Sequence, residues 1–513
     1  MTRLLRLACL IAFFAALSGC ASVDFDYPKP ESAALTETAD TVIGKQLAGL
    51  AEAHPGESGF FTMSDGIDAL SSRLLLAERA ERSIDAQYYL IKDDIVSHAF
   101  ISVLLRAADR GVRVRLLIDD MFTGGFDAGI AGLDSHPNFE IRVFNPFARR
   151  SARFMDGITS FSRINRRMHN KSFTADNQMT IIGGRNIADE YFGAREDAKF
   201  GDLDVMGIGP VVNEVSDMFD SYWNHERAAT VEAFADMPDD PAAELERVRA
   251  VLADSQEQIT TTKYAAAVRD QYLEYEETSA DVFTWAPYTL AVDSPDKNFK
   301  KEAKTAASIT TPLRESLLAA KTEAIIISPY FVPRKAGVEA LIELQRSGVA
   351  ITIITNSLAA NNQSSVHAGY APSRKPLLES GVKIYEVRPD ADVSGSELMA
   401  ASGAKATLHT KAFIVDRHDF FIGSFNFDPR SANINTELGV IIKSEELASE
   451  AAELITAALA EQTYEVFLNE KGKLRWRGLR NGEEVIYEKE PQTTWGQRFM
   501  AGFMRILPIR GQL

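Results

Sequence analysis

The sequence predicts an α/β protein in which two similar domains of one chain face each other across a shared site. The first observation behind this prediction is a spaced pattern that occurs twice, 240 residues apart (409 − 169). The second is that the same order of strand, helix and strand precedes each copy. Two copies in register indicate a duplication and a site built from both halves. The copies are His169, Lys171, Asp176 and Asn186, and His409, Lys411, Asp416 and Asn426.

Each half carries the strand–helix–strand order that is typical of a βαβ unit. Alternating apolar residues predict the strands, apolar residues at helical spacing predict the helices, and a glycine ends each helix. From that glycine to the motif histidine there are 58 residues in one half (169 − 111) and 61 in the other (409 − 348), so the repeat covers whole domains. The expected elements are strand 83–89, helix 95–110 and strand 112–118, then strand 324–330, helix 337–346 and strand 349–354.

The N-terminus predicts an exported lipoprotein. A basic stretch at 1–6 precedes eleven apolar residues at 7–17, too few to span a bilayer as a stable helix. Leu17-Ser-Gly-Cys20 resembles the bacterial lipobox, which implies cleavage before Cys20 and lipidation of its thiol. The alternatives are an ordinary secretory signal or an uncleaved anchor. We expect a membrane-anchored lipoprotein outside the cytoplasm, on the periplasmic face of a two-membrane cell, with the choice between outer and inner membrane left open.

The chain divides into six expected segments. A lipoprotein signal peptide (1–19) and a lipid-anchored tether (20–57) precede the first domain (58–236). A helical linker or insertion (237–280) leads to the second domain (281–470), and a tail (471–513) carries an amphipathic helix. Trp495, Phe499 and Phe503 recur in that helix at helical spacing, so it either docks on the body of the protein or grips lipid.

Charge and composition limit the partners. The formal charge is −17, which disfavours nonspecific binding to nucleic acid. The only cysteines are Cys9 and Cys20, so the mature chain has no disulfide and no thiol-based metal site. Asp119-Asp120 lacks a supporting ligand cluster and is interpreted as a strand end. We therefore expect no metal and no cofactor.

The duplicated residues suit chemistry on a phosphodiester. Side chains two apart on a strand share a face, so each histidine and its lysine project into the same space. A histidine can attack phosphorus, and a lysine can neutralise phosphate oxygens. The asparagines and Ser424 add neutral donors. One imidazole would attack while the other protonates the leaving alcohol and deprotonates the incoming one, which requires opposite starting protonation states.

This constellation resembles the phospholipase D superfamily, whose signature is H-x-K-x4-D twice in one chain. The resemblance implies two similar α/β/α domains packed face to face, an interfacial active site without metal, and a phosphohistidine intermediate. His169 matches the nucleophile and His409 the acid/base, although the symmetry of the sequence does not decide between them. The remaining matches are Lys171, Lys411, Asn186 and Asn426 as phosphate binders, Asp202 and Glu437 as carboxylates that orient the histidines, and Asp176 and Asp416 as members of the catalytic signature that we interpret as structural partners.

Longer segments, such as 166–173 and 183–192, are similar to bacterial cardiolipin synthases, and 85–89 and 424–431 to their C-type group. That similarity implies transfer of a phosphatidyl group from phosphatidylethanolamine or phosphatidylglycerol onto phosphatidylglycerol. Phospholipids and the membrane, held through the lipid anchor and the C-terminal helix, are then the partners, and an accessory protein is left open. The alternatives are a hydrolytic phospholipase D, a nuclease, or a noncatalytic lipid-binding lipoprotein.

Four further residues have two interpretations each. His367 and Tyr370 either contribute to the pocket or lie on a surface helix. Tyr88 and Tyr330 end equivalent strands, and either line the cleft or pack in the core.

Overall fold

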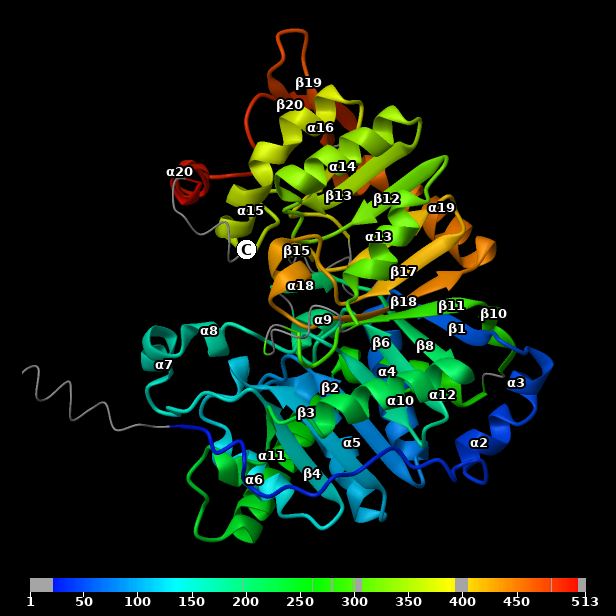
Figure 1. Ribbon diagram of the computed structural model, residues 1–513, viewed down its shortest axis with the longest axis vertical. Helices are drawn as coiled ribbons and strands as arrows, with labels where there is room; N and C mark the ends of the chain where they lie inside the picture. The colour runs from blue at the N-terminus through cyan, green and yellow to red at the C-terminus, as the bar shows by residue number, and fades with distance from the viewer. Residues whose placement is uncertain are drawn as a thin grey trace, which may run out of the picture.

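The computed structural model describes residues 22–195, 197–260, 262–277, 280–297, 299, 307–392, 405–480 and 482–505. Cys20, the expected signal peptide and residues 506–513 lie outside the described residues. Two large mixed sheets, each flanked by helices, stand one above the other in Figure 1. The strands are β1 Ser58–Met63, β2 Ser83–Tyr88, β3 Arg113–Asp119, β4 Phe139–Phe144, β5 Ser172–Ala175, β6 Met179–Gly183, β7 Ala198–Gly201, β8 Asp204–Ile208, β9 Ala228–Ala229, β10 Thr284–Ala286, β11 Tyr288–Val292, β12 Glu323–Ile327, β13 Ala350–Asn356, β14 Lys383–Val387, β15 Lys405–Leu408, β16 Ala412–Val415, β17 Asp419–Gly423, β18 Leu438–Lys443, β19 Thr463–Leu468, β20 Leu474–Arg480 and β21 Glu483–Tyr487.

Helices pack on both faces of each sheet (Figure 1). The first half and its linker hold α2 Val42–Leu47, α3 Leu50–Ala53, α4 Gly66–Arg79, α5 Ile95–Asp109, η1 Asp120–Phe122, α6 Asp127–Asp134, α7 Arg153–Thr159, α8 Phe161–Ile164, α9 Asp189–Phe192, α10 Pro210–Trp223, η2 Val231–Ala233, α11 Pro241–Ile259, α12 Lys263–Glu277 and η3 Ala280–Val282. The second half holds α13 Thr310–Leu318, α14 Arg334–Arg346, α15 Ser364–Tyr370, η5 Ala371–Ser373, α16 Arg374–Glu379, α18 Pro429–Asn433, α19 Glu445–Gln462 and α20 Trp495–Met504.

The two sheets share one strand order. The first runs β10-β1-β8-β6-β5-β2-β3-β4-β9, and the second runs β11-β18-β17-β16-β12-β13-β14-β19-β20-β21. From β1 and from β11, eight strands follow each other in equivalent positions. The strand–helix–strand units predicted for the two halves are confirmed as β2-α5-β3 and β12-α14-β13, with parallel pairing of β2 to β3 and of β12 to β13. The duplication therefore covers whole domains.

The halves share an apolar interface. One cluster of buried side chains combines Ile182, Val205 and Phe219 from the first half with Ile414 and Val440 from the second. Burial of this kind of surface is the main favourable term in holding two domains together. The interface therefore fixes the two motif segments relative to one another.

The segments outside the domains are more closely packed than the sequence suggested. Residues 22–57 were expected to form a tether, but Arg115 donates a hydrogen bond to the Ser32 carbonyl (3.1 Å), and the Ala34 amide donates to Asp220 (2.8 Å). Such backbone contacts to buried charges hold the segment on the first domain. Strand β10 lies beside β1 in the first sheet, although the second domain was expected to begin at 281.

The tail joins the second domain through β20 and β21, and α20 packs against α15. Throughout the part of the chain given above, no helix combines the length and the apolar character that crossing a bilayer requires.

Candidate active site

Each motif histidine follows a short segment that pairs with the opposite half. Strand β15, which leads to His409, runs parallel to β7, with Leu408 opposite Gly201. In the first half, Met168 forms a parallel bridge with Thr436. The next residue in each pair is a histidine on one side and a carboxylate on the other. The same register, used twice, brings the two motifs to the interface of the sheets.

The carboxylates are exchanged between the halves. Nδ1 of His169 lies 2.8 Å from Oε2 of Glu437, and Nδ1 of His409 lies 2.5 Å from Oδ2 of Asp202. Both contacts are buried. A carboxylate on Nδ1 fixes the ring and its tautomer and leaves Nε2 as the reactive nitrogen. The sequence identified the four residues, but their exchange between halves is a finding of the structure.

Both lysines lie beside their histidines. Nζ of Lys171 donates to the His169 carbonyl at 2.5 Å, and Nζ of Lys411 lies 2.6 Å from Nδ1 of His409. Burial lowers the pKa of Lys171 to about 7, and burial lowers that of Lys411 to about 8. Burial makes the protonated form of both lysines costly in free energy. An anion bound beside them would offset this cost, so the site favours an anionic ligand.

The sequence led us to expect opposite protonation states for the two histidines, but the structure does not provide them. Burial, opposed by the Glu437 charge, lowers the pKa of His169 to about 4, and burial together with Lys411 lowers that of His409 to about 3. Burial alone would raise the pKa of Asp202, but the charges of Lys411 and His409 hold it at about 2. Both imidazoles are thus neutral at pH 7, because the two halves give them near-equivalent surroundings. A bound phosphate would have to create the asymmetry.

The neutral donors divide into two kinds. Ser424, expected to bind phosphate, donates its hydroxyl to Oε2 of Glu437 at 2.5 Å and accepts from the Leu438 amide at 3.0 Å. Asn186 donates to the Tyr191 hydroxyl at 2.9 Å. The Oδ1 atoms of Asn186 and Asn426 are buried and have no hydrogen-bond partner among the described residues. The asparagines therefore have polar capacity left for a ligand, whereas Ser424 holds Glu437.

The motif aspartates lie at the far ends of the motif strands. Asp176 follows β5 and accepts from the amides of Glu81 (3.0 Å), Arg82 (2.7 Å) and Ser83 (3.0 Å). Asp416 follows β16 and accepts in the same way from the amides of residues 321–323. Both have φ near +50°, a conformation that Asp tolerates well. This arrangement agrees with our interpretation of them as structural partners.

Aromatic side chains that the sequence did not single out surround the histidines. The Tyr89 ring lies edge-on to His169 with centroids 5.0 Å apart, and Tyr191 does the same to His409 at 4.9 Å. The Phe200 ring stacks on His409 at 5.6 Å. Tyr88 instead points into the core, where its hydroxyl accepts from Arg73 (3.0 Å). One residue of register separates Tyr88 from Tyr89, and strand alternation sends the two to opposite faces.

His367 and Tyr370 belong neither to the site nor to a surface helix. Nε2 of His367 lies 3.2 Å from Glu490, and the Tyr370 hydroxyl donates to Glu386 at 3.0 Å. Arg374 bridges the two carboxylates at 3.1 and 2.8 Å. This buried network ties the tail, through Glu490, to the second domain.

Asp119 and Asp120 are occupied within the protein. Asp119 ends β3 and accepts from the amides of Met121 (2.9 Å) and Met168 (3.0 Å), and Asp120 pairs with Arg150 and Arg153. Among the residues that the structure describes, no three His, Cys, Asp or Glu side chains are grouped to hold a metal ion.

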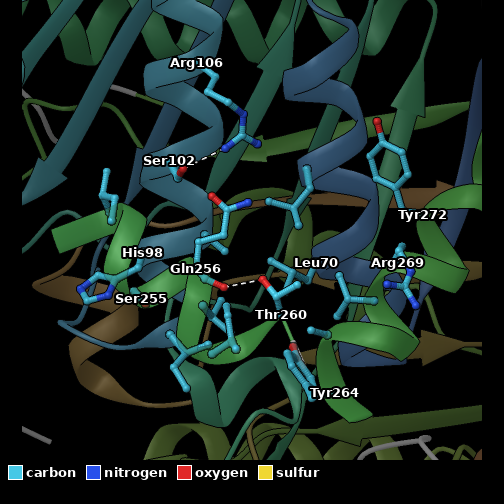
Figure 2. Close-up of a pocket in the computed structure, with 18 of the residues that line it drawn as sticks. Leu70, His98, Ser102, Arg106, Ser255, Gln256, Thr260, Tyr264, Arg269 and Tyr272 are labelled. Atoms are coloured by element: carbon cyan, nitrogen blue, oxygen red, sulfur yellow. Dashed lines mark hydrogen bonds between the residues drawn. The ribbon is translucent and has the colours of Figure 1, made fainter. Parts of the chain in front are cut away.

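Cavities also lie away from the histidines. Figure 2 shows one of about 420 Å³ between α4, α5, α11 and α12, where Leu70, Tyr264 and Arg106 line the wall. No motif residue lines it. The motif histidines are instead largely buried, with His169 8% and His409 7% exposed.

Comparisons with known proteins agree with this arrangement. A family model described as "Cardiolipin synthase, PLD-like domain" matches the chain at residues 75–223 and 313–458. Cardiolipin synthase C of Escherichia coli K12 is 41% identical over 473 residues, 90% of this chain and 97% of that protein. The minor cardiolipin synthase ClsB of Bacillus subtilis is 25% identical over 388 residues, 75% of this chain and 77% of that protein.

A solved structure shares the fold. The crystal structure of phosphatidylserine synthase from Haemophilus influenzae superposes with a TM-score of 0.57 at 11% identity, covering 88% of this chain and 95% of that one. The likeness extends over both halves, so it supports the two-domain architecture.

Proposed function

The chain belongs to the cardiolipin synthase family with phospholipase D-like domains, and on that premise we propose that it moves a phosphatidyl group onto phosphatidylglycerol through a phosphohistidine at His169. The donor would be phosphatidylethanolamine or a second phosphatidylglycerol. The observation that carries the proposal is the exchanged pair of contacts, His169 to Glu437 and His409 to Asp202. These contacts give two oriented imidazoles in one buried site, as a double displacement requires.

The first half-reaction forms the covalent intermediate. Nε2 of His169 attacks phosphorus, a P–N bond forms, and the P–O bond to the headgroup alcohol breaks. His409 gives its Nε2 proton to that alcohol, which leaves as ethanolamine or glycerol. Binding of the anionic phosphodiester would raise the low pKa of His409, which allows it to carry this proton.

The second half-reaction forms a new P–O bond and breaks the P–N bond to His169. A hydroxyl of phosphatidylglycerol gives its proton to Nε2 of His409, and its oxygen attacks phosphorus. The P–N bond breaks and His169 is restored, with cardiolipin as the product. Lys171 and Lys411 stabilise the charge on the phosphate oxygens in both steps, and Asn186 and Asn426 bind the same group.

We also propose that lipid on Cys20 anchors the protein at the extracytoplasmic face of a membrane. The lipobox-like sequence at 17–20 supports this, and residues 20–57 lead from it to the first domain. An anchored enzyme meets its phospholipid substrates in the plane of the bilayer.

The test is lipid mass spectrometry of a cardiolipin-deficient bacterium that expresses the chain, beside its His169→Ala variant. Restored cardiolipin with the wild type alone supports transfer, and labelled phosphatidylethanolamine then identifies the donor. Accumulation of phosphatidic acid instead would make water the acceptor and the protein a hydrolase. Cleavage of an oligonucleotide that depends on His169, with no lipid product, would make it a nuclease.

A further inference from the structure

Two helical segments, one from each half, present large apolar side chains to solvent. On α7 the Phe154 and Ile158 side chains are 72% and 73% exposed, and on α8 Phe161 is 48% exposed. Contiguous exposed apolar side chains on a globular protein usually mark a surface that another body covers. Neither α7 nor α8 was singled out by the sequence.

The second segment is α20. Trp495, Phe499 and Phe503 are 72%, 56% and 48% exposed, and the Trp495 and Phe499 rings stack with centroids 5.1 Å apart. The helix is held by a capping box at Thr494 and buries Ala501, so its apolar face is fixed outward. Trp and Phe on one side of a short helix are typical of helices that lie in a membrane interface.

A cluster of arginines lies beside α8, in a chain whose net charge is −17. Arg227 stacks on the rings of Phe25 (4.5 Å) and Phe299 (5.3 Å), and Arg166 stacks on Phe299 (5.4 Å). Burial and the charge of Arg227 lower the pKa of Arg166. Glu226 lies 3.6 Å from Arg227 and offsets one of the three charges of Arg163, Arg166 and Arg227, so these arginines keep a net positive charge that favours an anionic partner.

These features lie on one side of the molecule. In Figure 1, α7 and α8 project from the left of the first domain, and α20 lies at the left of the second. Arg163 on α8 stacks on Phe25 at 5.8 Å, so the N-terminal segment reaches the same edge. Cys20 precedes Phe25 by five residues (25 − 20), at most about 18 Å of extended chain.

We propose that α7, α8 and α20, with Arg166 and Arg227, form one docking face for an anionic phospholipid bilayer. Apolar side chains enter the acyl boundary, and the arginines meet the phosphates of phosphatidylglycerol. Charge favours an anionic bilayer as the partner of this face. A bilayer rich in anionic lipid attracts the arginines at this edge and repels the acidic remainder of the protein. The face would hold the molecule in one orientation.

The docking face is connected to the active site. Helix α8 ends at Ile164, five residues before His169, and Asn165 accepts a hydrogen bond from Arg430 of the second half at 2.8 Å. Docking would therefore place the interface of the two domains at the lipid surface. The inference deepens the proposed function, because it says how a lipid substrate reaches the histidines.

The test measures binding without turnover, so that it stands apart from the proposed reaction. The expected mature chain (residues 20–513) carrying Cys20→Ser, which has neither the apolar leader at 7–17 nor a lipid anchor, is floated with equimolar phosphatidylglycerol/phosphatidylcholine vesicles and with phosphatidylcholine vesicles. We expect the double variants Phe154→Ser/Ile158→Ser and Trp495→Ser/Phe499→Ser each to weaken partition to the anionic vesicles by about tenfold or more. Arg166→Gln/Arg227→Gln should reduce the preference for anionic vesicles by about tenfold and weaken its dependence on salt.

A matched control uses exposed apolar residues elsewhere. Leu318 on α13 and Leu454 on α19 are 58% and 66% exposed, and both helices lie on the opposite side in Figure 1. Leu318→Ser/Leu454→Ser should leave partition unchanged. The proposal would be overturned if the control lost as much partition to the vesicles as the apolar double variants. It would also be overturned if both apolar double variants bound vesicles as the parent does, or if they lost self-association of the protein in place of vesicle binding.

A second measurement separates docking from folding and from chemistry. The face variants should keep the parent's thermal midpoint and its turnover in detergent micelles, while turnover on vesicles falls. If the proposed reaction is wrong, no turnover is seen in either setting, yet the binding differences remain. Loss of micelle turnover with normal vesicle binding would contradict the docking proposal.

Discussion

His169 and His409 each direct Nδ1 to a carboxylate, which leaves Nε2 to meet the substrate. If one imidazole attacks and the other moves the proton, neither can be spared. We predict that His169→Ala and His409→Ala each lower turnover at least about a thousandfold. A detergent-micelle transfer assay measures this, with His98→Ala, whose ring pairs with Asp93 outside the site, as the matched control. Activity within tenfold of wild type in either motif variant would remove that histidine from the mechanism.

The buried lysines predict the alkaline side of the pH profile. Burial lowers the pKa of Lys171 to about 7 and that of Lys411 to about 8, and each must be protonated to bind phosphate. Raising the pH through 7 and 8 removes these charges, so kcat/KM should fall over that range. Lys171→Arg keeps its charge, so the fall should move up to about pH 8, where Lys411 titrates, at a lower maximum. An alkaline limb that Lys171→Arg leaves in place would contradict this assignment.

Ser424 and Gly184 occupy equivalent positions next to the two carboxylates. Ser424 donates to Glu437, whereas a Cβ on Gly184 would lie 2.1 Å from Oδ1 of Asp202. We predict that Gly184→Ala displaces Asp202 and lowers kcat about a hundredfold, while Ser424→Ala costs about tenfold, since loss of such a supporting contact usually costs 10–100-fold. Steady-state kinetics measure both. A rise in KM with unchanged kcat in Ser424→Ala would mean that Ser424 binds substrate directly.

At this scale the sequence indicated which motif residues lie together better than it indicated the residues around them. A repeated spacing makes His169, Lys171 and their counterparts visible without any structure. No repeated spacing marks Tyr89. Adjacent residues of a strand point to opposite faces, so the sequence does not show whether Tyr88 or Tyr89 faces the site. The absence of a split between the histidine pKa values also could not be foreseen, since it depends on how evenly the two halves bury them.

At the scale of elements, local patterns were sufficient for the βαβ units. Alternating apolar residues and helix-ending glycines placed β2, α5 and β3 within about two residues of their observed bounds, as local hydrogen bonding and burial dictate. The pairing of β15 with β7 joins segments about 200 residues apart and leaves no periodic trace in either. The contact of Asp202 with His409 follows from that pairing, and the contact of Glu437 with His169 follows from the bridge between Met168 and Thr436. The exchange was therefore visible only in three dimensions.

The motif aspartates should act on stability rather than on chemistry. Asp176 is fully buried and accepts from three consecutive backbone amides at the start of β2. We predict that Asp176→Asn lowers the free energy of unfolding by about 1–3 kcal/mol, because a neutral amide oxygen accepts from the three backbone amides more weakly than a carboxylate does, and the new NH2 group faces the Glu81 amide. The thermal midpoint measures the change, and turnover per folded molecule should stay within about threefold of wild type. A thousandfold loss of turnover at an unchanged midpoint would make Asp176 catalytic.

At the scale of the whole molecule, the proposed active site lies where the two domains meet. Glu437 of the second half orients the proposed nucleophile, and Asp202 of the first half orients the proposed acid/base. We predict that Glu437→Gln mainly slows formation of the covalent intermediate, whereas Asp202→Asn slows both its formation and its release to the acceptor alcohol, because His409 carries the proton in both steps. Rapid-quench kinetics separate the two steps. Equal effects on both steps from both variants would argue against distinct roles for the histidines.

The central claim is that a phosphatidyl group passes through His169 in a site shared by both halves. Its most direct test is intact-protein and peptide mass spectrometry after brief mixing with phosphatidylethanolamine and neutral quenching, for the wild type, His169→Ala and His409→Ala. We predict a phosphatidyl adduct on the peptide that contains His169 in the wild type, less of the same adduct in His409→Ala, where the leaving alcohol lacks its proton donor, and none in His169→Ala. An adduct on the peptide containing His409, or steady turnover with no adduct in any of the three proteins, would contradict the claim.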